Sequence, residues 1–207
     1  MQRLKGIVVP IVTPFDDLGR VDAHALRNLC GYLIEHKVHG LYPCGTTGEA
    51  TLLTDEERKD VAQIVVERAG GKVPVFIHVG AASTQSAMDL AKHAVDIGAD
   101  GIAAVTPYYF KLSQESLIRY YEQIISVIPS DYPFYLYNIP SLAGNDIAPA
   151  TVGYLAEKYP NIVGIKNSMP DILRAQEYLN CREGFSVMLG NDSLVAIGAF
   201  IGCDGAV

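Results

Sequence analysis

The sequence of 207 residues predicts a (β/α)8 barrel, or TIM barrel, and three observations favour this fold class. Eight short apolar runs alternate with segments that have the caps and spacing of helices, as in a fold built from βα units. Hydrophobic residues make up 49% of the chain, which is typical of strands buried on both faces. Residues 97–102 resemble residues 201–206, and both segments read as a helix end, a tight turn and a strand start. The alternative is an open doubly wound sheet, but its typical GxGxxG loop is absent from the sequence.

The expected strands span, in chain order, residues 6–12, 40–43, 75–79, 101–105, 134–137, 162–166, 186–189 and 205–207. Helices are expected between them over residues 22–36, 54–69, 83–98, 113–128, from 149 onward and over 171–180. Asp22 has the short polar side chain that caps a helix start, and Thr54 with Glu57 has the spacing of a capping box. Pro149 suits the first turn of its helix, because the N–H that proline lacks would be unpaired there anyway.

A single domain is expected over residues 1–207, because no linker, low-complexity tract or shift of composition interrupts the chain. A barrel of this kind typically needs ~250 residues. The sequence stops as the eighth expected strand begins, so the last helix and any helical region after the barrel are expected to be missing. We therefore expect an incomplete barrel, truncated within its eighth strand, from a longer protein.

Charge and apolar pattern argue against several classes of protein. A formal net charge of −7 disfavours a nucleic-acid-binding surface, which needs clustered positive charge. The first apolar run is too short for a signal peptide, and none is long enough to span a bilayer. The four cysteines have none of the spacings of a zinc site. We expect a cytoplasmic protein with reduced thiols and with no metal, membrane or nucleic-acid partner.

Lys166 ends the sixth expected strand, where an ammonium group is costly to bury. Burial lowers the pKa of a lysine, and a neutral amine attacks ketones to form a Schiff base. The alternative is that the side chain extends from the strand end into solvent. Alternation predicts that Ile162, Gly164 and Lys166 face the barrel interior while Val163 and Ile165 face the helices. Gly164 is then expected to leave space just below the lysine.

Two other strand ends carry polar groups that are expected on the same face of the barrel, where the active sites of this fold lie. Thr46 and Thr47 lie in a glycine-rich loop whose N–H groups and hydroxyls suit a carboxylate, with an ordinary tight turn as the alternative. Alternation turns Tyr137 inward beside Lys166, where its hydroxyl suits proton transfer, and an aromatic packed in the core is the alternative. His78, at the end of the third strand, is interpreted as structural.

Five short motifs occur in one order along the chain: TPF at 13–15, GTTGE at 45–49, TPYY at 106–109, YNIP at 137–140 and GIK at 164–166. Together they resemble the dihydrodipicolinate synthase / N-acetylneuraminate lyase family of class I, pyruvate-dependent aldolases, over the whole chain. The resemblance implies a lyase or aldolase without a metal or organic cofactor. It also implies a homotetramer arranged as a dimer of dimers.

The resemblance further implies roles for individual residues. Lys166 matches the lysine that forms a Schiff base with pyruvate or another 2-keto acid, and Tyr137 matches the tyrosine that shuttles protons. Thr46 and Thr47 match the pair that holds the carboxylate of the keto acid and joins the proton relay. Tyr109 matches the tyrosine that completes the relay by reaching into the site of the neighbouring subunit.

The implied second substrate depends on a few further positions. Val207 matches a position that lines the pyruvate site. Leu142 replaces an arginine that binds the carboxylate of aspartate semialdehyde in the synthases, and leucine cannot pair with a carboxylate. Sialic acid lyases tolerate leucine there but usually carry an acidic pair after strand seven, where this chain has Asn191 and Asp192. Both are taken as candidate ligands for sugar hydroxyls, although only one is an acid.

The expected function is therefore a Schiff-base lyase or aldolase that cleaves a 2-keto-3-deoxy sugar acid to pyruvate and an aldehyde. Dihydrodipicolinate synthase, which condenses pyruvate with aspartate semialdehyde, is the first alternative. A catalytically silent protein that binds a keto acid is the second.

Overall fold

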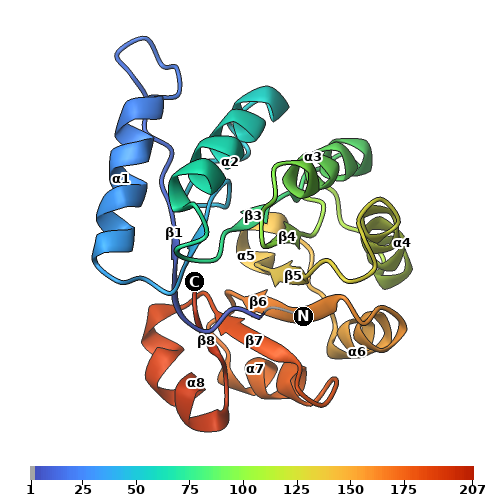
Figure 1. Cartoon of the computed structure of the whole chain (residues 1–207). Helices are drawn as coiled ribbons and strands as arrows, with labels where there is room; N and C mark the ends of the chain where they lie inside the picture. Colours follow the sequence, from blue (N-terminus) through green and yellow to red (C-terminus); the bar gives the residue numbers. More distant parts are fainter. Residues whose placement is uncertain (1–2) are drawn as a thin grey trace.

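The computed structural model describes residues 3–207 and confirms the barrel (Figure 1). Its strands are β1 (Gly6–Pro10), β2 (Gly40–Tyr42), β3 (Phe76–His78), β4 (Gly101–Val105), β5 (Phe134–Asn138), β6 (Ile162–Asn167), β7 (Ser186–Leu189) and β8 (Gly205–Ala206). They pair in parallel in the order β2-β1-β8-β7-β6-β5-β4-β3. A parallel bridge between Leu41 and Val75 joins β2 to the start of β3, so the sheet closes on itself.

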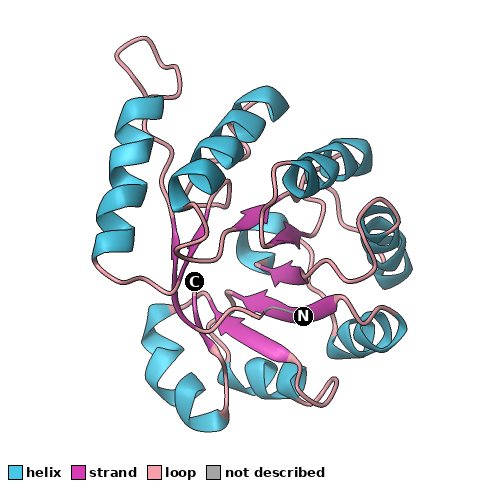
Figure 2. Ribbon diagram, viewed as in Figure 1, coloured by secondary structure: helices cyan, strands magenta, loops and turns pink. Residues whose placement is uncertain are grey.

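Most of the helices surround the ring of strands on its outside (Figure 2). They are α1 (Ala23–Glu35), α2 (Asp55–Ala69), α3 (Thr84–Asp96), α4 (Gln114–Ile125), α6 (Pro149–Lys158), α7 (Ile172–Leu179) and α8 (Val195–Ile201). The short α5 (Pro140–Ala143) is seen within the ring in Figure 1, and a 3-10 turn, η1 (Asp192–Leu194), precedes α8. Asp22 caps α1 by accepting from two backbone N–H groups, and both bonds of the Thr54–Glu57 capping box are present. Two helices were not predicted: α5 is only four residues long, and the residue before α8, Leu194, makes no side-chain cap.

The strands separate two apolar cores. Phe134 and Leu136 of β5 point outward into the large core under the helices. Tyr135 points inward, where it packs with side chains from β1, β2, β3, β4, β6 and β7. The alternation predicted for β5 is therefore confirmed, and it follows from the period of two of an extended chain. Among residues 3–207, no helix has the length and apolar character needed to cross a membrane.

The faces predicted for β6 are wrong at two residues. Ile162 packs in the outer core and Val163 in the inner one, the reverse of strict alternation. The pairing of β5 with β6 shifts at this point, because Phe134 lies opposite Ile162 whereas Tyr135 lies opposite Gly164. Val163 is therefore an extra residue, a β-bulge, and regular alternation resumes after it.

Gly164 does face the interior, but it leaves no empty space. A Cβ atom there would lie 2.5 Å from Cε1 of Tyr135 and 2.7 Å from Cβ of Ser186. The glycine thus lets the Tyr135 ring lie directly against the β6 backbone. The Tyr135 hydroxyl continues this packing by donating to Ser186 Oγ at 2.9 Å.

Candidate active site

A cavity of about 550 Å³ lies among the C-terminal ends of the strands. Lys166 from β6 and Tyr137 from β5 line it together with Thr46 and Thr47 from the loop after β2. The rest of the lining comes from β1, the loops after β5, β6 and β7, and the residues around β8. Parallel strands place these groups together because all their carboxyl ends open on one face of the barrel.

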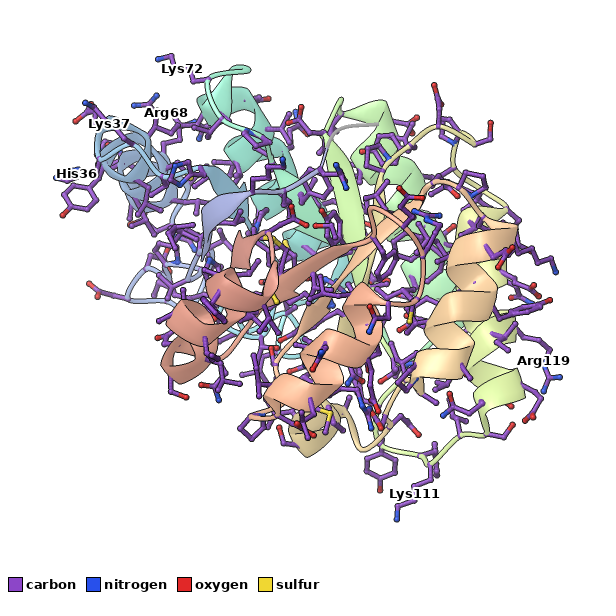
Figure 3. The ribbon with its side chains drawn as sticks, turned by 90° about the horizontal axis from the view of Figure 1, so that it is seen from below. His36, Lys37, Arg68, Lys72, Lys111 and Arg119 are labelled. Carbon is purple, nitrogen blue, oxygen red and sulfur yellow. The ribbon has the colours of Figure 1, made fainter. Side chains whose placement is uncertain are left out.

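Lys166 is the one cation in the lining of this cavity, among the residues that the structure describes. Other cationic side chains, such as Lys72, Lys111 and Arg119, extend outward from the ribbon toward solvent (Figure 3). Only 5% of Lys166 is exposed, so the alternative of a side chain that extends into solvent is wrong. Burial lowers the pKa of its amine from 10.5 to about 7. A substantial share of Lys166 is then neutral near pH 7, which is the nucleophilic form.

Tyr137 lies directly opposite Lys166 in the pairing of β5 with β6. The Lys166 Nζ is 4.4 Å from the centroid of the Tyr137 ring. The Tyr137 hydroxyl is 3.3 Å from Thr46 Oγ1, and either atom can donate in this hydrogen bond. The phenol and the threonine hydroxyl thus form a short hydrogen-bonded path in the cavity that Lys166 also lines. Such a path can move a proton to or from a group bound beside the lysine.

The loop that carries Thr46 and Thr47 is held by its backbone. Cys44 has a φ of 58°, a left-handed conformation that is uncommon for a residue other than glycine. Gly48 packs so closely that a Cβ atom would lie 3.0 Å from the carbonyl oxygen of Ile11. Thr13 donates from Oγ1 to the Gly48 carbonyl at 2.7 Å. With the loop held in this way, both threonine side chains are exposed and line the cavity.

Of the three other candidate residues, Val207, Asp192 and Asn191, two line the cavity and one does not. Val207 and Asp192 line the cavity. Asn191 does not line it: its Oδ1 accepts hydrogen bonds from the N–H and the hydroxyl of Ser193, at 3.1 and 2.6 Å. The side chain thereby caps η1, which is a common use of asparagine before a helical turn.

Tyr109 does not line the Lys166 cavity within its own chain. It is 88% exposed, has a φ of 83° and packs edge to face on Phe110. It lines an adjacent cavity of about 410 Å³, which it shares with Thr46 and Leu142. Thr46 lines both cavities, so the two spaces meet at its side chain.

His78 has a structural role in this fold, as predicted from the sequence. Its Nδ1 donates to the carbonyl of Cys44 at 2.8 Å, and its Nε2 accepts from the N–H of Val105 at 3.2 Å. Burial lowers its pKa from 6.5 to about 3. The imidazole is therefore neutral near pH 7 and has no free nitrogen for catalysis.

Comparison with known proteins agrees with this geometry. A family model described as the dihydrodipicolinate synthetase family matches residues 3–207. The chain belongs to this family. It is 40% identical over 191 residues to the 4-hydroxy-tetrahydrodipicolinate synthase of Nitratidesulfovibrio vulgaris, covering 92% of this chain and 64% of that protein. The family resemblance inferred from the five motifs is therefore confirmed.

Solved structures of related proteins have the same fold as this family member. YagE of E. coli K12, solved in complex with pyruvate, has a TM-score of 0.93 at 35% identity, covering 98% of this chain and 69% of that one. The 2-keto 3-deoxygluconate aldolase of Picrophilus torridus has a TM-score of 0.93 at 36% identity, covering 99% of this chain and 73% of that one. The chain spans slightly less than two thirds of the length of the curated relatives it matches.

Two further residues of this family member lie at the site without having been predicted. Ser168 lines the cavity, and its hydroxyl occupies the position that a side chain at Gly190 would need. Tyr42 presents its ring to Lys166, with Nζ 4.5 Å from the ring centroid. The sequence offered only one signal for these two residues, which is their place next to predicted site residues. Ser168 follows Lys166 by two residues, and Tyr42 precedes the loop that carries Thr46 and Thr47.

A hydrogen-bonded network behind the site joins the ends of β5 and β6. Asn138 and Asn167, which follow the tyrosine and the lysine, are paired in register and fully buried. Asn138 Nδ2 donates to Asn167 Oδ1 at 3.3 Å and to Asp146 Oδ1 at 3.0 Å. Arg174 of α7 donates from Nη1 to both oxygens of Asp146, at 2.9 and 2.8 Å. The network ties the two strands together just beyond the residues that face the cavity.

Proposed function

We propose that the full-length protein is a class I lyase or aldolase that forms a Schiff base between Lys166 and a 2-keto acid such as pyruvate. The observation that carries this proposal is the buried Lys166 amine, whose pKa burial lowers to about 7, opposite Tyr137 in a strand-end cavity. The pyruvate complex of YagE supports the choice of keto acid. The matched set of lysine, tyrosine and threonine argues against the catalytically silent alternative.

The proposed reaction begins with attack of the neutral Nζ on the keto carbon. The carbonyl oxygen takes one hydrogen from the amine and one proton from Tyr137 and leaves as water, so that a positively charged iminium joins Lys166 to the keto acid. Thr46 and Thr47 hold the carboxylate through their hydroxyls and the loop N–H groups. In the cleavage direction, the Tyr137 oxygen takes the proton of the 4-hydroxyl, the C3–C4 bond breaks, its electrons pass to the iminium, and the aldehyde leaves. The resulting enamine takes that proton at C3, and addition of water to the iminium releases pyruvate and restores the free amine.

The proposed aldehyde half is the neutral portion of a 2-keto-3-deoxy sugar acid. Within the described part of the chain, the cavity at Tyr109 and Leu142 has no cationic side chain in its lining to pair with a second carboxylate. Ser168 and Asp192 supply groups that suit sugar hydroxyls on the lysine side. Similarity to the Picrophilus torridus aldolase supports this substrate class.

A second candidate function is dihydrodipicolinate synthesis from pyruvate and aspartate semialdehyde. The similarity to the 4-hydroxy-tetrahydrodipicolinate synthase of Nitratidesulfovibrio vulgaris favours it. Leu142 counts against it, because an exposed leucine offers no partner for the carboxylate of aspartate semialdehyde.

The proposed assembly is a homotetramer in which Tyr109 reaches the site of a neighbouring subunit. Its high exposure and its absence from the lining of the Lys166 cavity of its own chain support a role outside its own site. We propose the cytoplasm as the compartment, which suits the four free thiols of the described residues.

The test is to trap the Schiff base in the full-length protein. Incubation with pyruvate and borohydride, followed by peptide mapping with mass spectrometry, is expected to find a reduced adduct on Lys166. Lys158, which pairs with Glu122 on the surface, is the internal control and is expected to stay unmodified. A protein without an adduct on Lys166 contradicts the proposal.

Aldehyde release separates the candidate functions. A panel of 2-keto-3-deoxy sugar acids is expected to yield pyruvate and an aldehyde. If pyruvate with aspartate semialdehyde is the only productive pair, the synthase is the function. An adduct with no turnover on any substrate identifies the silent binder.

A further inference from the structure

Tyr42, the last residue of β2, contacts Lys166 through the face of its ring. The Lys166 Nζ lies 4.5 Å from the centroid of Tyr42 and 4.4 Å from that of Tyr137. The two rings meet edge to face, with centroids 6.4 Å apart and planes at 85°. The nitrogen is thus held against two aromatic rings that come from separate strands.

The hydroxyl of Tyr42 does not account for the position of this side chain. It is buried and has no hydrogen-bond partner among the residues that the structure describes. Burying a hydroxyl without a partner costs free energy, so the hydroxyl does not stabilise this side chain in its position. The stabilising contacts of Tyr42 are therefore those of its ring. Burial also raises the pKa of Tyr42 well above its ordinary value, so the phenol stays neutral when Lys166 titrates.

The face of an aromatic ring attracts a cation, and the attraction is stronger when the pair is shielded from water. Lys166 needs a partner of this moderate strength. A carboxylate beside it would hold the amine as an ammonium ion, whereas burial alone would disfavour every charged form. A ring face favours the cation while leaving the amine able to lose its proton.

We infer that Tyr42 is a positioning residue for Lys166, whose ring face orients the nitrogen and stabilises the positive charge of the iminium. This inference rests on the proposed function, because the iminium arises only when Lys166 reacts with a 2-keto acid. In that step the neutral amine adds to the keto carbon. The carbonyl oxygen receives one hydrogen from the amine and one proton from the Tyr137–Thr46 relay, and it leaves as water. The nitrogen keeps one hydrogen and acquires the positive charge, and it stays against the same two rings.

Few other titratable groups face Lys166. Tyr137 reaches it from β5, and the neutral His78 of β3 lies against both tyrosine rings, with centroids at 6.2 Å from Tyr42 and 5.8 Å from Tyr137. Asp192, after β7, lines the same cavity and is exposed. Among residues 3–207, no carboxylate forms a salt bridge with Lys166. The Tyr42 ring can therefore be varied while the charges around the lysine stay the same.

The experiment measures the rate of pyruvate trapping on Lys166 by cyanoborohydride as a function of pH in the full-length protein. Tyr42→Phe keeps the ring face and removes only the unpaired hydroxyl, so its midpoint is expected to match that of the unmodified protein. Replacing Tyr42 with trifluorophenylalanine keeps the shape but withdraws electrons from the face. The midpoint is then expected to fall by roughly half to one and a half pH units, the range between an exposed and a desolvated cation–π contact.

Tyr42→Leu removes the face altogether and is expected to lower the midpoint in the same direction. An equal midpoint for the phenylalanine and trifluorophenylalanine proteins overturns the inference, whatever the leucine variant does. Failure of the proposed function looks different, because the unmodified protein and Tyr42→Phe would then both lack an adduct on Lys166.

Discussion

Tyr137 and Lys166 lie opposite each other on neighbouring strands, and the lysine nitrogen is 4.4 Å from the centroid of the tyrosine ring. The bulge at Val163 is responsible for this pairing. If every residue of β6 were paired in turn from Phe134 and Ile162, Tyr137 would lie opposite Ile165, and Lys166 would face the helices. The residue left unpaired in β6 therefore places the amine on the same side of the sheet as the phenol.

The rate of pyruvate trapping on Lys166 is expected to rise with pH through a midpoint near 7. Burial lowers the pKa of this amine to about 7, and only its neutral form attacks a carbonyl. Trapping rates measured by mass spectrometry over a pH series check this expectation. A midpoint close to 10.5, the ordinary value, would mean that burial leaves this amine unaffected.

Lys166→Met is expected to abolish the adduct and to stabilise the fold at pH 7. The unfolded amine binds a proton below pH 10.5, whereas the folded amine binds one only below about 7. Between these values the unfolded state carries more protons, so the stability of the unmodified protein rises with pH. The variant is therefore expected to be more stable at pH 7 by roughly 2–5 kcal/mol, with a smaller gain near pH 10. Denaturant unfolding at both pH values measures the free energy of unfolding of the two proteins. A variant less stable than the unmodified protein at pH 7 would contradict the expectation.

Thr46→Val is expected to lower turnover by about 10²–10⁴-fold while the pyruvate adduct still forms. Valine keeps the shape of threonine but removes the hydroxyl that lies 3.3 Å from the Tyr137 oxygen. Thr46→Ser keeps a hydroxyl and serves as the matched control, with activity near that of the unmodified protein. Steady-state rates compared with adduct yields separate proton transfer from binding. Equal turnover in the valine and serine variants would show that the Thr46 hydroxyl takes no part in proton transfer.

Tyr109→Phe is expected to lower turnover at least tenfold without changing the oligomeric state. Tyr109 is 88% exposed and does not line the Lys166 cavity of its own chain, so its proposed role is in a neighbouring subunit. Tyr108→Phe, in the same loop, is the control. Hybrid oligomers of Tyr109→Phe and Lys166→Met subunits are expected to regain part of the activity, because each subunit supplies what the other lacks. Unchanged activity in Tyr109→Phe counts against the relay between subunits.

The helices predicted from the sequence begin at a capping side chain or, for α6, at Pro149, whereas α5 and α8 were not predicted. Asp22 and Thr54 mark the starts of α1 and α2 by hydrogen bonds that depend on nearby residues only. The helix α8 follows Leu194, which offers no such signal, so its position depends on packing against β7 and β8. Asn191 was predicted as a ligand, but a local bond to Ser193 occupies its oxygen.

The sequence by itself determined the barrel and the inward tyrosine at 137, because these follow from alternation, apolar runs and the motifs of one family. Tertiary structure alone decided the bulge in β6 and the contact between Lys166 and the ring of Tyr42. The physical reason is that both depend on strands distant in the chain meeting as the sheet closes. Packing across the barrel decides where the register shifts by one residue and which way a ring faces. A pattern along the chain carries no information about that packing.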